Sequence, residues 1–147
     1  MTLEIAVFLS MDGKAKEAIA FYKEHLQAEE LLLVSYMDMA ERDAGMMLTE
    51  ENKDYISHCV LRIGRSNLMI AEETMDPREQ YEAGNNFSLC IQSANLAEIR
   101  LFYQNMMRDS RVKVIQPLEA NVFSEAYGVV RDPFGVDIQL MYDPRLS

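Results

Sequence analysis

Tryptophan is absent from this chain of 147 residues, and cysteine occurs only twice, with no CxxC pair. Cys59 and Cys90 lie in apolar stretches typical of strands, which favours buried free thiols over a disulfide or a redox pair. Long apolar runs are missing as well, since none approaches the ~20 residues that a membrane-spanning helix needs. The opening stretch MTLEIAVFLSMDGK carries an acidic residue where a signal peptide has basic ones. The sequence therefore predicts a cytoplasmic protein without a membrane partner.

Basic residues are scarce. The chain has 14 Lys and Arg against 24 Asp and Glu, a formal charge of -10, and no cluster of cations offsets it locally. Such a chain repels phosphate backbones, so a nucleic-acid partner is not expected. The sequence has no glycine-rich phosphate loop, no GxGxxG after a strand and no GxSxG nucleophile elbow. A nucleotide site is therefore not predicted, while a Ser-His-Asp or Cys-His arrangement stays open.

The residues that are present describe a folded domain. Hydrophobic residues make up 49% of the chain and charged residues 26%, as is usual for globular proteins. A chain of this length can bury roughly 70% of the surface that its unfolded form exposes. The eleven methionines predict a pliable interior, because Met fills irregular gaps. That interior suits an adaptable pocket and a plain core equally.

The first half predicts one strand, one helix and three strands. LEIAVFLS is apolar nearly throughout, as in a strand covered on both faces, and the turn residues MDG follow it. From Lys14 onward apolar residues recur at helical spacing, which predicts an amphipathic helix over roughly residues 14 to 27. LLLVSYMDM, YISHCVLRIG and SNLMIAEE are the strand candidates, with a possible short edge strand at Met46 to Leu48.

The second half repeats this order. NNFSLCIQS predicts a strand, and NLAEIRLFYQNMMRD predicts a helix with Asn95 as N-cap and Glu98 in the capping-box position. RVKVIQPL, AYGVVRD and VDIQLMYD predict three further strands.

Matching phrases support the repeat. The two helices contain EAIAFY and EIRLFY, and the two final hairpins align with Leu68 opposite Ile138. Two copies of a strand-helix-three-strand unit can pair into one curved sheet with helices outside and a cavity inside. We therefore expect a single α+β domain over residues 1–147, with module one at about 1–76 and module two at about 84–145.

Three stretches carry a family resemblance: FLSMDGKAKEAIAFY, ISHCVLRIGRSNLMIAEE and VRDPFGVDIQLMYD. With them, nearly the whole chain resembles the PhnB-like branch of the vicinal oxygen chelate superfamily, which includes glyoxalase I, fosfomycin- and bleomycin-resistance proteins and extradiol dioxygenases. The resemblance implies two βαβββ modules that form a curved mixed sheet around a cavity, commonly in a homodimer. Some PhnB-like proteins carry a methyltransferase label, but nothing here resembles an S-adenosylmethionine site.

In metal-using members of that superfamily, His, Glu or Gln side chains bind the ion from four equivalent strand positions. Carried over by the resemblance, these positions fall at Val7 or its neighbour Ala6, and at Met69, Ser88 and Gln139. Only Gln139 has a suitable side chain. Divalent ions need several oxygen or imidazole donors together, so no metal cofactor is predicted.

Strand parity places Gln139 independently of the resemblance. Alternate residues of a strand face opposite sides of a sheet. In VDIQLMYD and FSLCIQS one face is bulky and apolar, as in a strand packed on a helix, and the other is small, polar or thioether-bearing. We hypothesise that the second face lines a cavity; its residues, with their counterpart in module one, are Gln139, Met141, Met69, Ser88, Cys90 and Gln92.

His58 is the strand histidine, and a ligand-binding or catalytic role is possible for a group that titrates near neutral pH. A histidine hydrogen-bonded to a neighbouring loop is the more frequent case. Glu72 and Glu73 end a strand at a predicted cavity mouth, where they would act as acid, base or ligand, or would only be solvated. His25 lies in the last turn of a helix, which favours a structural role through the helix dipole.

The turn sequence DPFG gives Asp132 and Gly135 a structural interpretation, because the turn needs a side-chain acceptor at its start and a positive φ at its end.

The preferred interpretation is a cytoplasmic homodimer that binds a small, partly apolar organic molecule without a metal, as the drug-resistance members imply. A metal-dependent lyase or transferase of glyoxalase type, with ligands drawn from His58, Glu72 or Gln139, is the first alternative. The second is a structural or regulatory dimer whose pocket is filled by its own Met side chains. The sequence does not identify a ligand or a reaction.

Overall fold

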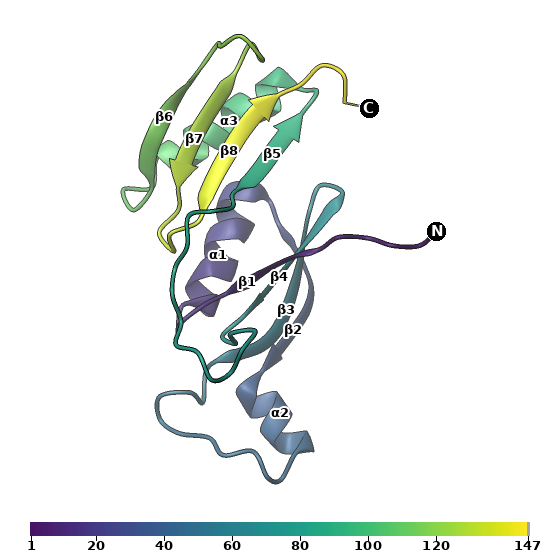
Figure 1. Cartoon of the computed structure of the whole chain (residues 1–147), viewed down its shortest axis with the longest axis vertical. Coiled ribbons are helices and arrows are strands. Elements are labelled where there is room, and N and C mark those ends of the chain that lie inside the picture. The colour runs from purple at the N-terminus through teal and green to yellow at the C-terminus, as the bar shows by residue number, and fades with distance from the viewer. Residues whose placement is uncertain (147) are drawn as a thin grey trace. The chain divides into compact units, whose positions relative to one another are not determined.

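A computed structural model describes residues 1–146 of the chain (Figure 1). The chain divides into two compact units, Met1–Glu82 and Ala83–Ser147. Each unit has a four-stranded mixed sheet and a helix packed on it, so the α+β class is confirmed.

The first unit follows the predicted order with one additional helix. Its sheet has the strand order β1-β4-β3-β2, in which β1 is parallel to β4 and the other pairs are antiparallel. Its elements are β1 (Val7–Ser10), α1 (Ala15–Leu26), β2 (Glu29–Ser35), α2 (Tyr36–Arg42), β3 (Ile56–Ile63) and β4 (Ser66–Ala71).

The second unit repeats the arrangement. Its strand order is β5-β8-β7-β6, again with one parallel pair between the first and last strands. Val7 pairs with Leu68 in the first unit and Leu89 pairs with Ile138 in the second, so Leu68 and Ile138 occupy equivalent positions as predicted. The elements are β5 (Leu89–Ser93), α3 (Leu96–Met107), β6 (Lys113–Glu119), β7 (Tyr127–Arg131) and β8 (Asp137–Tyr142).

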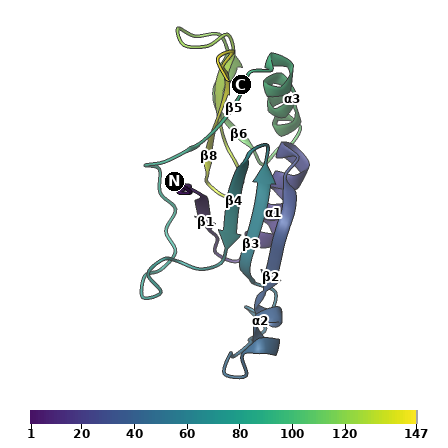
Figure 2. The same cartoon turned by 90° about the vertical axis from the view of Figure 1, so that its right-hand side faces the viewer.

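Helix α1 covers one face of the first sheet (Figure 2). Phe21 and Tyr22 of α1 are almost completely buried, as are Leu61 and Ile70 of the strands beneath. His25, in the last turn of α1, is buried with its ring centroid 4.5 Å from that of Phe21. The structure therefore gives His25 a place in the core.

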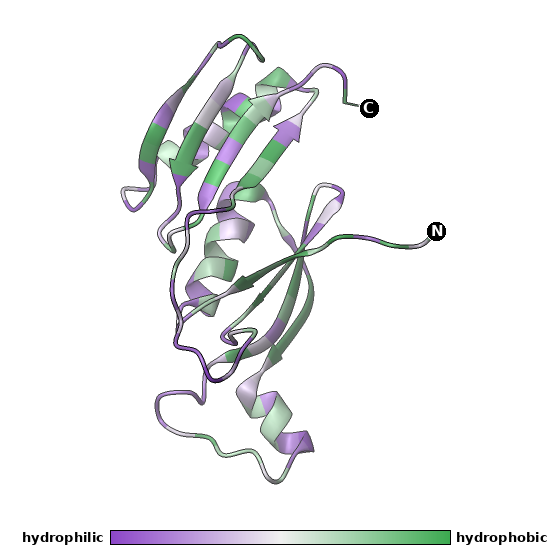
Figure 3. Ribbon diagram, in the orientation of Figure 1, coloured by the Kyte–Doolittle hydropathy of each residue, from purple (hydrophilic) through white to green (hydrophobic). Residues whose placement is uncertain are grey.

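Helix α3 covers the second sheet in the same way. Ile99 and Met106 are fully buried, as are Ile138 and Leu140 of β8. Figure 3 shows the apolar, green stretches of the strands in both units, whereas the segment between β4 and β5 is largely purple. The alternation of apolar and polar residues in β8 thus reflects one face packed on a helix.

The N-terminus of α3 confirms Asn95 as the cap, because its side chain accepts a hydrogen bond from the backbone N–H of Glu98 at 3.3 Å. The reciprocal half of the predicted capping box differs. The Glu98 carboxylate accepts from the Ser93 hydroxyl at 2.9 Å, and Ser93 Oγ accepts from the Asn95 N–H at 3.0 Å. Ser93 thus connects the two residues that a capping box joins directly.

The strand predicted from LLLVSYMDM was too long. Strand β2 ends at Ser35, whose side chain accepts from Asp38 N at 3.1 Å while the Asp38 carboxylate accepts from Ser35 N at 2.9 Å. This capping box starts α2 at Tyr36, and both hydrogen bonds hold the pKa of Asp38 below its usual value. The capping box therefore ends the strand earlier than the apolar pattern predicted.

Other boundaries differ from the prediction. Residues Met46 to Leu48 form no strand, and the Met47 side chain is 82% exposed, so it has no neighbour to pack against. The first strand was predicted from Leu3, but it begins at Val7, the first residue paired with β4. Strand β5 begins at Leu89 instead of Asn85.

Candidate functional site

Each sheet has an open face, defined here as the face turned away from the helix of its own unit. In the second unit Gln139 alternates with the buried residues Ile138 and Leu140, so it lies on the open face. Its partners in register are Cys90 of β5 and Val129 of β7, which share that face. Gln139 is therefore on the side that strand parity predicted.

The strand registers arrange the open face of the second unit in three rows. The middle row is Cys90, Gln139, Val129 and Gln116. The row toward the end of β8 is Gln92, Met141, Tyr127 and Glu119. The row toward the start of β8 is Ser88, Asp137, Arg131 and Lys113, where Ser88 continues the β5 register by one residue.

Two hydrogen bonds fix the side-chain amide of Gln139. The hydroxyl of Tyr127 donates to Gln139 Oε1 at 2.8 Å. Gln139 Nε2 in turn donates to Ser88 Oγ at 2.7 Å. These three side chains, Tyr127, Gln139 and Ser88, are called the amide relay below. In this orientation the carbonyl end of the amide accepts and the amino end donates.

The row at the start of β8 carries most of the charge of this face. Arg131 Nε lies 2.7 Å from Asp137 Oδ1, and this carboxylate raises the pKa of the Arg131 guanidinium above its ordinary value. Lys113 is exposed at the next register position. The row therefore has two cations and one anion.

The open face of the first unit has a different character. Met69 pairs with Phe8 and with Val60, and His58 lies two residues from Val60 on the same face. His58 pairs with Val34 of β2. The predicted residues Met69 and His58 thus share one half-buried, mainly apolar face, and the other five share the open face of the second unit: Gln139, Met141, Ser88, Cys90 and Gln92.

The four metal positions of the family pattern do not fit an ion. Continuing each parallel register by one residue makes Ser88 equivalent to Ala6, which decides between Ala6 and Val7. An alanine methyl and the thioether of Met69 are poor donors for hard or borderline divalent ions, so Gln139 Oε1 and the neutral Ser88 hydroxyl would have to hold the ion without an imidazole or carboxylate ligand. Within residues 1–146 no three His, Cys, Asp or Glu side chains form a metal-binding group.

Glu72, a proposed acid, base or ligand, acts as a structural acceptor. Its carboxylate accepts from the backbone N–H of Ala15 at 2.7 Å and of Ile56 at 2.5 Å. Burial raises the pKa of Glu72 despite these hydrogen bonds. The side chain joins the first turn of α1 to the start of β3. Glu73 is exposed, as the solvated alternative predicted.

The DPFG turn has the predicted construction. Asp132 is buried, and its Oδ1 accepts from the N–H groups of Phe134 and Val136 at 2.9 Å each. Gly135 has a φ of 87°, a conformation that favours glycine.

Both cysteines are free thiols, but only one is buried. Cys59 lies in the core of the first unit, and burial raises its pKa to about 11. Cys90 is exposed on the open face of the second unit, so the prediction of a buried thiol was wrong there. The open face leaves its small side chain uncovered.

Sequence reasoning missed Tyr127 as a partner of Gln139. The signal was the parity of AYGVVRD, but using it required the register of β7 against β8, which pairs Tyr127 with Met141 and Val129 with Gln139. The side chain of Tyr127 reaches diagonally to the amide.

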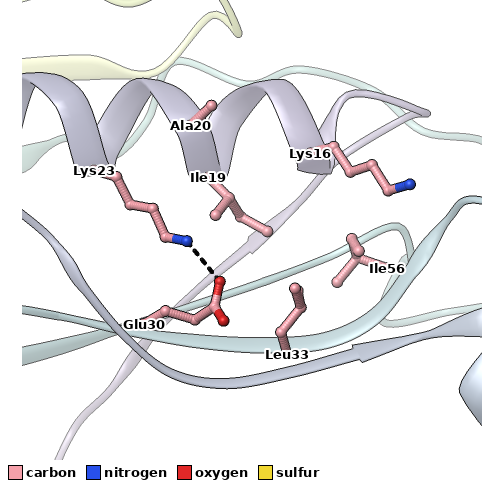
Figure 4. A pocket seen from close by; sticks show the side chains of 7 residues that line it. All are labelled: Lys16, Ile19, Ala20, Lys23, Glu30, Leu33 and Ile56. Carbon is pink, nitrogen blue, oxygen red and sulfur yellow. Dashed lines mark hydrogen bonds and ion pairs between the residues drawn. The ribbon is translucent and has the colours of Figure 1, made fainter.

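A groove of about 270 Å³ on the helix side of the first sheet was also missed (Figure 4). It lies between α1 and β2. Lys23 Nζ and Glu30 Oε1, 2.7 Å apart, form an ion pair at the edge of this groove. Its lining residues are Lys16, Ile19, Ala20, Lys23, Glu30, Leu33 and Ile56.

No helix within the described residues 1–146 is long and apolar enough to cross a membrane.

Comparisons with known proteins agree with this fold. The sequence model of the Glyoxalase/Bleomycin resistance protein/Dioxygenase superfamily matches residues 4–140. Protein YjdN of Escherichia coli (strain K12) is 25% identical over 142 residues, which are 91% of each chain. The crystal structure of protein PA1353 from Pseudomonas aeruginosa has a TM-score of 0.77 at 22% identity and covers 97% of this chain and 98% of its own. The PhnB protein from Bacillus cereus, described as a putative 3-demethylubiquinone-9 3-methyltransferase, has a TM-score of 0.72 at 21% identity over 96% and 100% of the two chains.

Proposed function

Because the chain belongs to the Glyoxalase/Bleomycin resistance protein/Dioxygenase superfamily, we propose that it binds a small, partly apolar organic molecule without a resident metal ion. The proposed binding surface is the open face of the second unit. Its rows place the apolar side chains of Cys90, Val129 and Met141 beside polar groups, among which the Gln139 amide is fixed by hydrogen bonds at both ends.

The amide relay is the observation that carries this proposal. Each end of the Gln139 amide has its own partner, so the group is held in place on an open face while one of its N–H groups stays without an acceptor among the described residues. The relay lies in a row with Val129 and Cys90, where an apolar group can contact the sheet beside it. A fixed amide beside apolar surface orients a ligand at little entropic cost.

The alternative of a filled pocket is less well supported. Met141 and Met69 are both partly exposed on the open faces of their units. Cys90 and Gln92 are exposed beside Met141. The methionines of these faces therefore leave surface uncovered within each unit.

A metal-dependent lyase or transferase requires a donor set that this chain lacks at the positions implied by its family. Of the ligands considered for that alternative, Glu72 accepts from two backbone N–H groups and Gln139 from Tyr127. Within residues 1–146 neither His58 nor Glu72 belongs to a group of three His, Cys, Asp or Glu side chains that could hold a metal ion. No specific observation favours this function over metal-free binding.

Thermal melts in chelator test the proposal. The protein is screened against a library of small organic molecules, and a ligand at 100 times its Kd is expected to stabilise the fold by about 2.7 kcal/mol. Melts in Zn, Mn, Ni and Mg without organic ligand serve as the matched comparison. Stabilisation by organic molecules in chelator supports the proposal, and stabilisation by metal ions alone contradicts it.

The homodimer and the cytoplasmic location are further parts of the proposal. Family resemblance supports the dimer, for which light scattering is expected to give about twice the chain mass of 16.9 kDa. Cell fractionation tests the location.

A further inference from the structure

The direction of the hydrogen bonds in the amide relay specifies what kind of ligand it binds. The carbonyl oxygen of Gln139 has no proton, so Tyr127 donates to it. The Nε2 amino group has no acceptor capacity, so Ser88 accepts from it. The relay is therefore one-way, from Tyr127 through Gln139 to Ser88.

At the end of the relay, Ser88 Oγ and Gln139 Nε2 each have a proton for which the described residues provide no acceptor. A serine hydroxyl can donate one hydrogen bond while it accepts others. Ser88 Oγ accepts from Gln139, and the structure records no acceptor for its proton among residues 1–146. Gln139 Nε2 carries a second N–H, for which the described residues likewise provide no acceptor. Two donor atoms only 2.7 Å apart thus each keep a proton available.

The two free donors favour an anion, because the carboxylate next to them is already paired. Ser88 starts the row that contains Asp137, Arg131 and Lys113. Asp137, next to Ser88, is paired with Arg131 at 2.7 Å, and Lys113 adds a cation at the far end of the row. A negatively charged oxygen at Ser88 and Gln139 therefore gains two charge-assisted hydrogen bonds, which a neutral oxygen does not.

The other neighbours of the relay favour an apolar body attached to that oxygen. Val129 and Cys90 flank Gln139 in its own row. Met141 lies in the next row on the side away from Arg131. A ligand whose acidic group meets Ser88 would therefore place the rest of its surface against valine, thiol and thioether groups.

We infer that the open face of the second unit binds small organic acids, and that the Ser88 hydroxyl and the Gln139 amide donate to the carboxylate. This inference rests on the proposed function and adds to it the ligand class and the two residues that determine it. The side chain of Tyr127 acts through Gln139 and is a positioning residue.

The test uses matched pairs of acids and alcohols: benzoate with benzyl alcohol, 2-naphthoate with 2-naphthylmethanol, and octanoate with octanol. Binding is followed in the full chain by amide NMR titration in chelator, with attention to the side-chain amide signals of Gln139 and Gln92. The acid of at least one pair is expected to shift the Gln139 signals and to bind more tightly than its alcohol.

Two variants test the donors. Ser88→Ala removes one charge-assisted donor and is expected to weaken the acid about tenfold to a hundredfold, with little effect on the alcohol. Gln139→Glu provides only acceptors, so the Ser88 proton turns toward residue 139 and acid binding is lost. Gln92→Glu, at an exposed position on the same face, adds the same charge outside the relay and is expected to weaken the acid much less.

The outcomes separate this inference from the proposed function. Equal binding of acids and alcohols, unchanged by Ser88→Ala, would overturn the inference and leave small-molecule binding intact. If no member of any pair shifts the signals of the open face, both the inference and the proposed function fail. Thermal melts of each variant show whether the fold is retained.

Discussion

Gln139 donates to Ser88 across 51 positions of sequence, with 2.7 Å between Nε2 and Oγ. One residue belongs to the last strand and the other immediately precedes β5, so the bond joins the two ends of the second module. Ser88 and Gln139 are two of the positions at which metal-using relatives would carry ligands. In this chain a hydrogen bond between two neutral side chains occupies those positions.

The bond from Tyr127 to Gln139 has a measurable effect on stability. Tyr127→Phe removes the hydroxyl and is expected to reduce the free energy of unfolding by about 0.5–1.5 kcal/mol. Tyr142→Phe is the control, because no hydrogen bond of the Tyr142 hydroxyl is recorded within residues 1–146. Urea titrations of both variants check this, and equal stability of the two would show that the relay contributes nothing to the fold.

The Glu72 carboxylate accepts two backbone N–H groups, from Ala15 and Ile56. In Glu72→Gln one of these donors faces an amino group and loses its acceptor, so we expect a loss of about 1–3 kcal/mol in the free energy of unfolding. Glu73→Gln makes the same change at the exposed neighbouring residue and is expected to alter stability by about 0.5 kcal/mol or less. If Glu72 is a structural acceptor, Glu72→Gln must cost more stability than Glu73→Gln. Losses of similar size in the two variants would contradict that role.

The two cysteines should differ in reactivity. Cys90 is exposed and Cys59 is buried with a pKa of about 11. Iodoacetamide at pH 8 should therefore modify Cys90 first and leave Cys59 unmodified in the folded protein. Peptide mapping by mass spectrometry measures both rates. Faster labelling of Cys59 would be inconsistent with its position in the core.

The raised pKa of Cys59 also predicts how stability changes at alkaline pH. The folded state holds the thiol proton more tightly than the unfolded state, whose value is near 9. This contribution is complete below pH 9 and is lost as the pH rises toward about 11. Cys59→Ala should therefore lose less stability than the wild type between pH 8 and pH 10.5. If the stability of the two proteins falls equally over this pH range, Cys59 does not contribute to the loss.

The core of the second unit offers a matched pair of adjacent residues in α3. Phe102 is 8% exposed and Leu101 is 45% exposed. Phe102→Ala is expected to cost about 3–5 kcal/mol, whereas Leu101→Ala should cost well under that because its side chain remains largely in water. Denaturant unfolding distinguishes them, and a larger loss for Leu101→Ala would place the wrong face of α3 on the sheet.

Much of the fold was predictable because hydrophobic periodicity and repetition act over the whole chain. The helix expected at about residues 14 to 27 is α1, Ala15–Leu26, and Asn95 caps α3. The alternation around Gln139 gave its face, since Ile138 and Leu140 could only suit a core. The family resemblance and the parity of the strands therefore predicted the same position for Gln139.

The remaining features depend on contacts that no local pattern encodes. Helix α2 begins at Tyr36 because Ser35 and Asp38 form a capping box within an apolar stretch. The partner of Gln139 was hidden because it depends on the register between β7 and β8. Cys90 is exposed because one face of its sheet is uncovered. Its apolar neighbours Leu89 and Ile91 made the strand look buried on both faces.

Native mass spectrometry of the untagged protein tests whether it binds an organic acid without a metal ion. It reports on the same intact species whether a metal ion, an organic molecule or neither is bound. We expect a chain without a metal adduct that gains the mass of an organic acid such as 2-naphthoate, with the gain lost in Gln139→Glu. A stoichiometric metal adduct that chelator removes, or no adduct with any organic acid, would contradict it.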